Sequence, residues 1–401
     1  MTKKSDAPAI RFKGFSDAWE QRKLGELALF NPKDELPQTF EYVDLESVVG
    51  TEMLSHRTEV KSSAPSRAQR LAHTGDLFYQ TVRPYQKNNY LFEKPDNNYV
   101  FSTGYAQMRP YVDGYFLLSL VQSERFVKVV LDNCTGTSYP AINANDLAEI
   151  EVAAPSDESE AQKIGTIFRS IDNLITLHQR KFEKLTNVKK SMLEKMFPQN
   201  GSSYPEIRFK GFTDPWEQRK VSDLAEKTYG GGTPTTSNEA YWNGDIPWIQ
   251  SSDVVDGKLL GVEPRKWITQ DGLNNSAAQL IPGNSIAIIT RVGVGKLAFM
   301  PYSYATSQDF LSLSKLNAEP LFTVYACYKK LQSELNAVQG TSIKGITKDE
   351  LLAKNIMVPR YAEQQQIGAF FKQLDHLITL HQRELEKLQN IKKSMLEKMF
   401  V

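Results

Sequence analysis

The sequence has little of several features that define large classes of proteins. Among its 401 residues are two cysteines, Cys134 and Cys327, which lie far apart in the chain. This excludes a disulfide framework and indicates a reducing compartment. No apolar run reaches the length of a transmembrane helix, and the N-terminus lacks the apolar region of a secretion signal. We therefore expect a soluble, cytoplasmic protein with no membrane partner.

An excess of charge of one sign is also absent. Lysine and arginine number 48 against 47 aspartate and glutamate, which gives a formal net charge of +1. Any surface for a nucleic acid must therefore be local, or shared with another subunit. Hydrophobic residues make up 40% of the chain, which is enough to bury packed cores. The length is typical of two or three domains.

Recognisable catalytic motifs are missing as well. The segment Gly293-Val-Gly-Lys296 lacks the upstream glycine of a phosphate-binding loop and is followed by Leu297 instead of Ser or Thr. Residue spacing supports no Ser/His/Asp or Cys/His set, and no cysteine stands near His178 or His381. We predict no catalytic residue, no metal site and no enzymatic activity of the chain itself.

What the sequence does contain is a long internal repeat. Residues 164–197 return as residues 367–400, with 24 of 34 positions identical. In both copies apolar residues recur at steps of three and four, and neither copy has an internal proline. This pattern predicts two helices, each about 51 Å long, which is typical of a coiled coil.

We expect the two helices to pack against each other, most simply antiparallel. His178 and His381 fall at core heptad positions, where a polar residue can fix the register of a helix pair. The simpler interpretation is that both imidazoles lie at the solvated edge of the seam. The lysine pairs 189–190 and 392–393 are predicted to lie on a solvated face. The predicted residues of the seam and of subunit docking are Ile171, Leu174, His178, Leu185, Leu374, Leu377, His381 and Leu388.

A second, shorter repeat precedes each long one. Residues 10–28 match residues 207–225 at 14 of 19 positions, so the chain is built twice from a lead segment, a variable region and a long helix. Two halves of similar length predict an internal pseudo-twofold arrangement. The alternative is a pair of ordinary tandem domains without that symmetry.

The two variable regions share a skeleton despite their different sequences. Each contains turns followed by strand-like runs, helices are expected at 115–132 and 319–335, and each region closes with a short turn into a strand that stops at a proline. This predicts the same mixed α/β domain twice. The matching segments are 75–83 with 283–291, which aligns Arg83 with Arg291, then 101–105 with 305–309, and 136–142 with 340–346.

The loops of both regions carry side chains suited to reading DNA. Arginine and lysine can bond guanine, asparagine and glutamine can bond adenine, and tyrosine can stack or contact phosphate. The alternative for each of them is a solvated surface loop, and for Trp242 and Trp248 a domain core. The predicted DNA contacts are Arg83, Tyr85, Lys87, Asn88, Asn89, Ser138, Tyr139, Arg291, Lys296, Gln308, Ser342 and Lys344.

Three strings in the second half are similar to those of a known family. They are Gly230-Gly-Gly-Thr-Pro-Thr235, then Tyr241-Trp-Asn-Gly-Asp-Ile-Pro-Trp-Ile249, and Gly340-Thr-Ser342 with Glu363-Gln364 ahead of the helix. With the double repeat, the whole chain resembles the specificity subunit of a type I restriction-modification enzyme. The first half departs from this pattern, because it has no Gly-Gly-Thr-Pro loop and carries Glu160-Ala-Gln162 in place of Glu363-Gln364.

The resemblance implies a fold class of mixed α+β, with two target recognition domains separated by two long antiparallel coiled-coil helices. The implied segments are a lead segment (1–23), target recognition domain 1 (24–155), a central conserved helix (156–200), a repeated lead segment (201–220), target recognition domain 2 (221–359) and a C-terminal conserved helix (360–401).

The resemblance also implies a non-catalytic subunit that reads double-stranded DNA at an asymmetric target of two half-sites. Two modification subunits would bind S-adenosylmethionine and methylate adenine, and restriction subunits would use ATP and Mg²⁺. The chain itself would bind no cofactor. The alternatives are a self-contained methyltransferase or nuclease, and a two-headed protein-binding adaptor without a DNA role.

Overall fold

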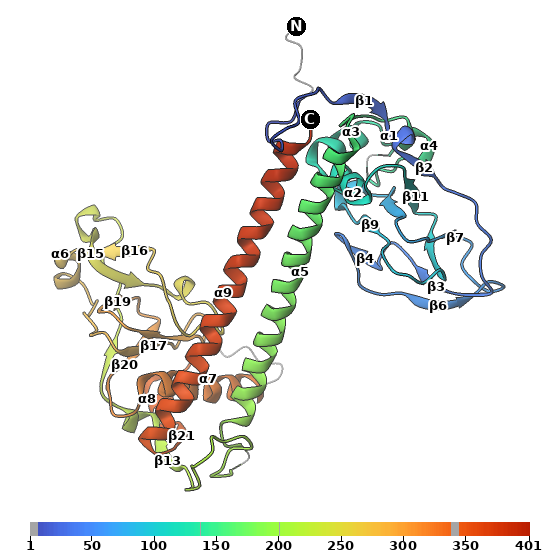
Figure 1. The fold of residues 1–401 in the computed structure, drawn as a ribbon. Helices are drawn as coiled ribbons and strands as arrows, with labels where there is room; N and C mark the ends of the chain where they lie inside the picture. Colours follow the sequence, from blue (N-terminus) through green and yellow to red (C-terminus); the bar gives the residue numbers. More distant parts are fainter. Residues whose placement is uncertain (1–6, 137, 200, 338–344) are drawn as a thin grey trace. The chain divides into compact units, whose positions relative to one another are not determined.

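The computed structural model describes residues 7–136, 138–199, 201–337 and 345–401. The chain divides into two compact units, unit 1 with residues 1–179 and 383–401 and unit 2 with residues 180–382. Two long helices, α5 (Glu158–Lys195) and α9 (Tyr361–Met399), contribute residues to both units (Figure 1). Across the described ranges, every helix is too short or too polar to span a membrane.

The strands of unit 1 form two larger sheets. Their orders are β6-β3-β10-β7 and β2-β11-β8-β9, and β1-β12 and β4-β5 make two shorter pairs among the described residues. The bounds are β1 (Glu20–Lys23), β2 (Ala28–Phe30), β3 (Thr39–Val43), β4 (Val48–Val49), β5 (Glu52–Met53), β6 (Arg57–Val60), β7 (Ala68–Leu71), β8 (Leu77–Gln80), β9 (Tyr90–Leu91), β10 (Tyr99–Ser102), β11 (Tyr105–Pro110) and β12 (Glu151–Ala154).

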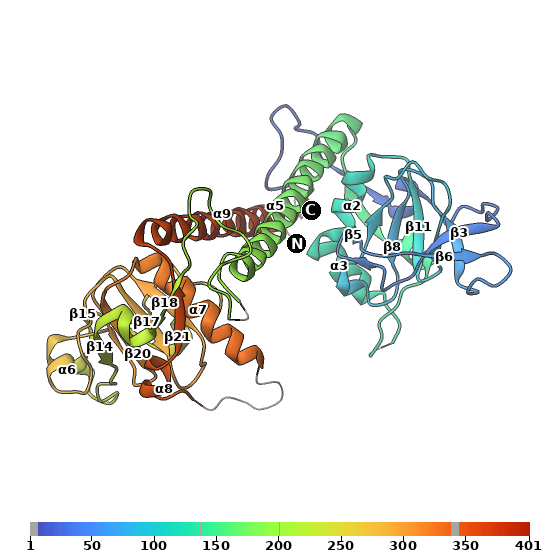
Figure 2. The ribbon, with the colours of Figure 1, turned by 90° about the horizontal axis from the view of Figure 1, so that it is seen from below.

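The helices of unit 1 correct one prediction. The single helix expected at 115–132 is two helices, α2 (Gly114–Gln122) and α3 (Glu124–Asp132), because Ser123 between them has an extended backbone. Its hydroxyl accepts the Phe126 N–H at 3.2 Å and so caps the second helix. Figure 2 shows α2 beside α5, with the strands of unit 1 beyond it. Two short helices, α1 (Leu24–Leu27) and α4 (Ala144–Ala148), and a 3-10 turn, η1 (Pro84–Gln86), complete the unit.

Unit 2 has the sheets β14-β20-β17-β18 and β16-β15-β19 and the pair β13-β21. Its helix α7 extends the predicted 319–335 by two residues at its end. The bounds are β13 (Glu217–Lys220), η2 (Val221–Leu224), β14 (Ala225–Gly230), η3 (Glu239–Tyr241), β15 (Trp242–Ile249), η4 (Ser251–Asp253), β16 (Lys266–Ile268), α6 (Gln270–Asn274), β17 (Ser285–Ile289), β18 (Leu297–Met300), β19 (Ala305–Thr306), β20 (Phe310–Leu316), α7 (Pro320–Ala337), α8 (Lys348–Leu352) and β21 (Asn355–Val358).

The two units repeat one topology. In β2-β11-β8-β9 and in β14-β20-β17-β18 every neighbouring pair is antiparallel. Among the described residues each unit also has one parallel pair, β3 with β10 and β15 with β19, in a second sheet of four strands in unit 1 and three in unit 2. In both, the lead segment forms an antiparallel pair with the strand that ends at a proline, β1 with β12 and β13 with β21. The predicted mixed fold and its internal repeat are confirmed.

Within each unit the segments of α5 and α9 run antiparallel, as predicted. In unit 1 the carboxylate of Asp172 meets the amine of Lys392 at 2.6 Å, and Phe168 lies 5.9 Å from Phe400 between ring centroids. In unit 2 the amine of Lys189 meets Asp375 at 2.5 Å. Residues later in α5 therefore contact residues earlier in α9, which is the pairing of antiparallel helices.

The same aromatic cluster joins the helices to the lead segment in each unit. In unit 1, Trp19 and Phe116 pack against Phe400 at centroid distances of 6.2 and 5.8 Å. In unit 2, Trp216 and Phe322 pack against Phe197 at 6.0 and 5.8 Å. The repeated sequence thus fills two equivalent cores.

Both long helices begin six residues before their predicted starts at 164 and 367, and they end at Lys195 and Met399. The extra turns carry Glu158, Glu160 and Glu363, and carboxylates near a helix N-terminus are stabilised by its dipole. These turns are less apolar than the repeat that predicted the helices, so the apolar period did not reveal them.

Gly165 of α5 is needed for close packing, which gives a testable prediction. A Cβ atom there would lie 1.8 Å from the Asp113 Oδ1 atom that caps α2. Gly165→Ala is expected to destabilise unit 1 by about 1 to 3 kcal/mol, although alanine favours an isolated helix. The measurement is thermal unfolding, with Ser170→Ala on an exposed position of α5 as the control. A Gly165→Ala protein as stable as the unmodified chain would contradict the packing argument.

Candidate nucleic-acid interface

The predicted contact residues of unit 1 gather where β8 ends. Thr81, the next residue, donates its N–H and its hydroxyl to the Gly104 carbonyl at 3.0 and 2.8 Å. The Thr81 carbonyl accepts the Ile142 N–H at 3.0 Å, and Arg83 donates its N–H to the Pro140 carbonyl at 2.8 Å. These bonds join three loops that are distant in sequence. We call this place the β8 junction.

Unit 2 contains the same construction at the end of β17. Thr290 donates its N–H and hydroxyl to the Asp309 carbonyl at 2.8 and 3.1 Å, and its own carbonyl accepts the Ile346 N–H at 2.8 Å. We call this place the β17 junction. The pattern of bonds is repeated, whereas the exposed side chains around it differ.

The junctions correct the predicted alignment of Arg83 with Arg291. Because Thr81 and Thr290 make the same three hydrogen bonds, they are equivalent, and Arg83 then corresponds to Val292. The segment from Gly283 to Thr290 is one residue longer than the segment from Gly75 to Thr81. An alignment that starts from the two glycines does not show this extra residue. The predicted alignment of 101–105 with 305–309 is also shifted by one, since Gly104 and Asp309 accept the equivalent bonds.

Four of the predicted contacts in unit 1 lie at the surface of the β8 junction. Arg83 is half-buried, while Tyr85, Ser138 and Tyr139 are exposed. The Arg83 guanidinium carbon lies 4.5 Å from the centroid of the Tyr139 ring. The junction therefore presents one guanidinium, two phenols and a hydroxyl together.

Three other predicted contacts of unit 1 are engaged by the fold. The Lys87 amine lies 2.7 Å from a Glu124 carboxylate oxygen, and the Asn88 side chain accepts the Gly50 N–H at 2.8 Å. Asn89 is 1% exposed and accepts the Gln80 N–H at 2.9 Å, so its side chain holds the backbone of the strand. We leave Asn89 out of the proposed contact surface.

In unit 2, Arg291 and Gln308 are exposed beside the β17 junction, and Lys296 is half-buried. Ser342 and Lys344, the other two predicted contacts, lie outside the described residues. Thr233 donates its hydroxyl to the Gln308 amide oxygen at 2.6 Å, which orients the amide. Thr233 is not among the predicted contacts, although it belongs to the Gly-Gly-Thr-Pro string that carries the family resemblance.

The glycine-rich loop is held tightly against the turn that precedes β20. A Cβ atom on Gly231 would lie 1.8 Å from the Ser307 carbonyl oxygen, so only glycine fits there. The Trp248 indole donates to the Gly232 carbonyl at 2.9 Å, and Trp248 is buried. Trp248 is therefore a core residue, while Trp242 is half-buried.

The predicted seam residues differ widely in exposure. Ile171 and Leu374 are buried, whereas Leu174 is 43% exposed although its equivalent in the second copy, Leu377, is half-buried. Lys189, predicted on a solvated face, is 8% exposed because it is paired with Asp375; this prediction was wrong. The other seam residues, all half-buried, are His178, Leu185, His381 and Leu388.

Neither cysteine is activated. Burial raises the pKa of Cys327 to about 12, and desolvation also raises the pKa of Cys134. Both thiols are therefore protonated near neutral pH and are poor nucleophiles. Among the described residues no group of three or more His, Cys, Asp or Glu side chains is placed to hold a metal ion.

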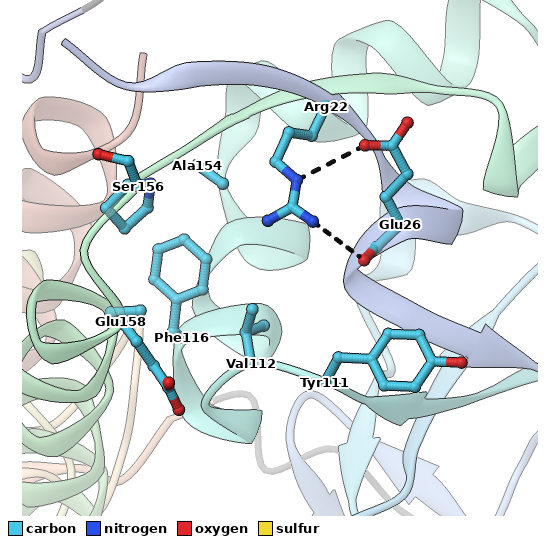
Figure 3. A pocket seen from close by; sticks show the side chains of 10 residues that line it. Arg22, Glu26, Tyr111, Val112, Phe116, Ala154, Ser156 and Glu158 are labelled. Atoms are coloured by element: carbon cyan, nitrogen blue, oxygen red, sulfur yellow. Dashed lines mark hydrogen bonds and ion pairs between the residues drawn. The ribbon is translucent and has the colours of Figure 1, made fainter.

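A hollow in unit 1 lies apart from the predicted contacts. Its walls come from β1, from the start of α2 and from the beginning of α5 (Figure 3). The Arg22 side chain in it bonds the Glu26 carboxylate at 3.5 Å and the Glu26 carbonyl at 3.4 Å. No predicted contact residue lines this hollow, and we assign it no ligand.

Comparison with known proteins gives consistent results. The chain is 28% identical over 193 residues to the type I restriction enzyme MjaIX specificity subunit of Methanocaldococcus jannaschii, over 46% of this chain and 44% of that one. It is 31% identical over 159 residues to the EcoR124I/EcoR124II specificity subunit of Escherichia coli, over 38% of this chain and 39% of that one. The chain thus spans less than half the length of these two relatives.

A solved structure shares the fold. The type I restriction-modification system S subunit from M. genitalium superposes with a TM-score of 0.65 over 98% of this chain and 99% of that one, at 13% sequence identity. At this identity the likeness concerns the fold alone.

A family model covers most of both halves. The model described as "Type I restriction modification DNA specificity domain" matches residues 17–187 and 213–390, and its two matches follow the internal repeat. With the same topology built twice and a related junction in each unit, the chain belongs to the type I restriction modification DNA specificity domain family.

Proposed function

We propose that this chain is the DNA-recognition subunit of a type I restriction-modification complex. Residues 24–155 and 221–359 serve as its two target recognition domains, and each reads one half-site of double-stranded DNA. The observation that carries the proposal is the junction built twice on the same three hydrogen bonds of a threonine, with different exposed side chains around it. A shared scaffold with divergent loops suits two readers of unlike sequences, so the target is asymmetric.

The reading chemistry differs between the two junctions. Unit 1 offers Arg83 with Tyr85 and Tyr139, whereas unit 2 offers Arg291 with Gln308 oriented by Thr233. Guanidinium and amide groups can bond base edges, and phenols can contact phosphate or stack. The net charge of +1 supports a division of labour, in which partner subunits supply much of the phosphate contact.

The long helices are the proposed docking surface for the other subunits. Large apolar side chains are exposed along α5 and α9, and burying them against a partner is favourable. Two modification subunits would bind there, carry S-adenosylmethionine and methylate adenine. Restriction subunits would bring ATP and Mg²⁺, and this chain would supply no catalytic group or cofactor. The complex would work in the cytoplasm. The exposed residues are Leu174, Leu177, Leu380 and Ile391.

The test compares methylation in cells with and without this chain, and then with a variant of one unit. Arg291→Ala is expected to lower methylation of the target about 5- to 100-fold through loss of a base or phosphate contact, with assembly of the subunits intact. Genome-wide detection of methylated adenine measures the effect.

The matched control is Arg219→Ala, since Arg219 is an exposed arginine of unit 2 paired with Glu217 on its own strand. It is expected to leave the methylated sites unchanged. If methylation proves independent of this chain, the proposed function fails. If Arg291→Ala prevents assembly, the assignment of Arg291 to the DNA surface fails.

A further inference from the structure

Two residues of the β8 junction have a backbone that side chains rarely adopt. Arg83 and Lys87 have φ angles of 54° and 55°, in the left-handed region, and they flank the 3-10 turn η1. A residue with a Cβ atom is disfavoured there, and such strain is found where a binding site needs a fixed geometry. The segment 83–87 is therefore a rigid turn, held in place by its surroundings.

Buried amide side chains hold this turn. Gln80, which is 2% exposed, donates to the Val82 carbonyl at 2.5 Å and to the Gln86 side-chain oxygen at 2.9 Å. Gln122, which is 7% exposed, donates to the Lys87 carbonyl at 2.9 Å. These bonds hold both ends of the turn, so the fold sets the point and direction in which the Arg83 side chain leaves the backbone.

The Tyr139 ring lies against the guanidinium of Arg83. Thr135 and Ala141 exchange two backbone hydrogen bonds of 2.9 and 3.1 Å, which close the short loop that carries Tyr139. The ring is 63% exposed and lies 4.5 Å from the Arg83 guanidinium carbon. A cation–π contact of this kind restrains the guanidinium without using its N–H donors as hydrogen-bond donors to another side chain.

Several arginines of unit 1 are held by carboxylates, whereas Arg83, like Arg67, Arg70 and Arg125, is not paired with one among the described residues. Arg57 pairs with Asp44 at 2.6 Å, and Arg109 pairs with Asp76 at 2.9 Å. Within the described part of the chain, Arg83 has no carboxylate partner. Its donors are therefore available to a ligand with two acceptors side by side.

From this geometry we infer that Arg83 reads a guanine of the half-site bound by unit 1, through the O6 and N7 atoms in the major groove. Tyr139 acts as the positioning residue. The inference rests on the proposed function and names the base that this junction recognises. The fork of a guanidinium matches the two acceptors of guanine, and a side chain held by a rigid turn and an aromatic ring suits a contact of fixed direction. Unit 2 has Val292 at the equivalent position, so this contact belongs to one half-site.

The test uses two variants of Arg83 in the whole complex. Arg83→Gly removes the side chain, and glycine favours the observed φ angle, so folding is retained. Arg83→Lys keeps the charge and loses the fork. Both are expected to lower methylation of the native target about 10- to 100-fold and to relax one G·C position in one half-site. Deep sequencing of methylated adenine over a library of targets with single changes measures this position.

The role of Tyr139 has a separate readout. Tyr139→Leu is expected to relax the same position more weakly, and Tyr139→Phe, which retains the ring, is expected to restore most of the discrimination. Arg125→Ala, on an exposed position of α3, is the matched control and should leave the preference unchanged.

Three outcomes would overturn the inference. A loss of equal size at every target sequence would make Arg83 a phosphate contact, and unchanged methylation by Arg83→Gly would exclude any contact. Relaxation in both half-sites would exclude a role confined to unit 1. In each of these cases the proposed function stands if the wild-type complex methylates its defined target only when this chain is present. A wild-type complex that methylates without this chain would overturn the proposed function itself.

Discussion

Arg208→Ala is expected to destabilise unit 2 by about 3 to 5 kcal/mol, because it leaves a buried carboxylate without its partner. Glu363 near the start of α9 is 1% exposed, and Arg208 of the lead segment donates two hydrogen bonds of 2.8 Å to its two oxygens. The same bonds raise the pKa of Arg208. Hydrogen exchange of the amides of unit 2, combined with denaturant unfolding, measures the loss.

The chain offers a matched comparison in unit 1. Arg11 bonds Glu160 at 2.6 and 2.8 Å, but Glu160 also accepts the Trp19 indole N–H at 3.2 Å. Arg11→Ala therefore leaves one donor in place, and we expect it to cost about 1.5 kcal/mol less than Arg208→Ala.

Trp216, the counterpart of Trp19 in unit 2, has no hydrogen-bond partner for its indole within the described residues. It cannot compensate for the loss of Arg208 in the way that Trp19 can for Arg11. Lys210→Ala, at an exposed position of the same lead segment, is the control and should change stability little. Equal losses from Arg208→Ala and Lys210→Ala would show that the ion pair is not what holds the lead segment to the helix.

Much of the fold was predictable because identical sequence forms identical structure. The repeats at 10–28 and 164–197 predicted that one topology is built twice, and the strand orders confirm it. The sequence also suggested that Glu160-Ala-Gln162 departs from Glu363-Gln364. In the structure, Glu160 and Glu363 bind equivalent arginines, so the departure is confined to the next residue. Gln364 bonds the Glu319 N–H and the Pro359 carbonyl, and alanine replaces it in unit 1.

The candidate site was less predictable because it depends on backbone geometry. The sequence placed Asn89 among polar loop residues, and nothing in residue order revealed that its side chain turns inward to bond Gln80. The left-handed conformation of Arg83 carries no glycine or asparagine signal. The one-residue shift that makes Arg83 equivalent to Val292 became visible through the hydrogen bonds of Thr81 and Thr290.

Lys189→Met is the second change expected to have a large effect, about 3 to 5 kcal/mol on unit 2. The Lys189 amine bonds Asp375 at 2.5 Å and the Gly257 carbonyl at 2.9 Å, and its side chain is 10% exposed. Methionine fills a similar volume and carries no charge. It would leave the Asp375 carboxylate, 15% exposed, with the Tyr325 hydroxyl at 2.6 Å as its remaining hydrogen bond. Burial and that carboxylate both raise the pKa of Tyr325, so it stays a donor.

The repeat provides the control, Lys392→Met in unit 1. Lys392 and Asp172 occupy the positions of Lys189 and Asp375 in the two copies of the repeat. The two carboxylates are similarly exposed, at 19% and 15%, but the Lys392 side chain is 21% exposed against 10% for Lys189, and the hydrogen bond to the Gly257 carbonyl belongs to Lys189. The expected cost is therefore about 1.5 kcal/mol less than that of Lys189→Met. Denaturant unfolding with hydrogen exchange of each unit measures both variants. The same lysine and aspartate form both pairs, so any difference between the two losses must come from their surroundings. Equal losses would show that burial in unit 2 and the bond to the Gly257 carbonyl add nothing to the stability of the Lys189–Asp375 pair.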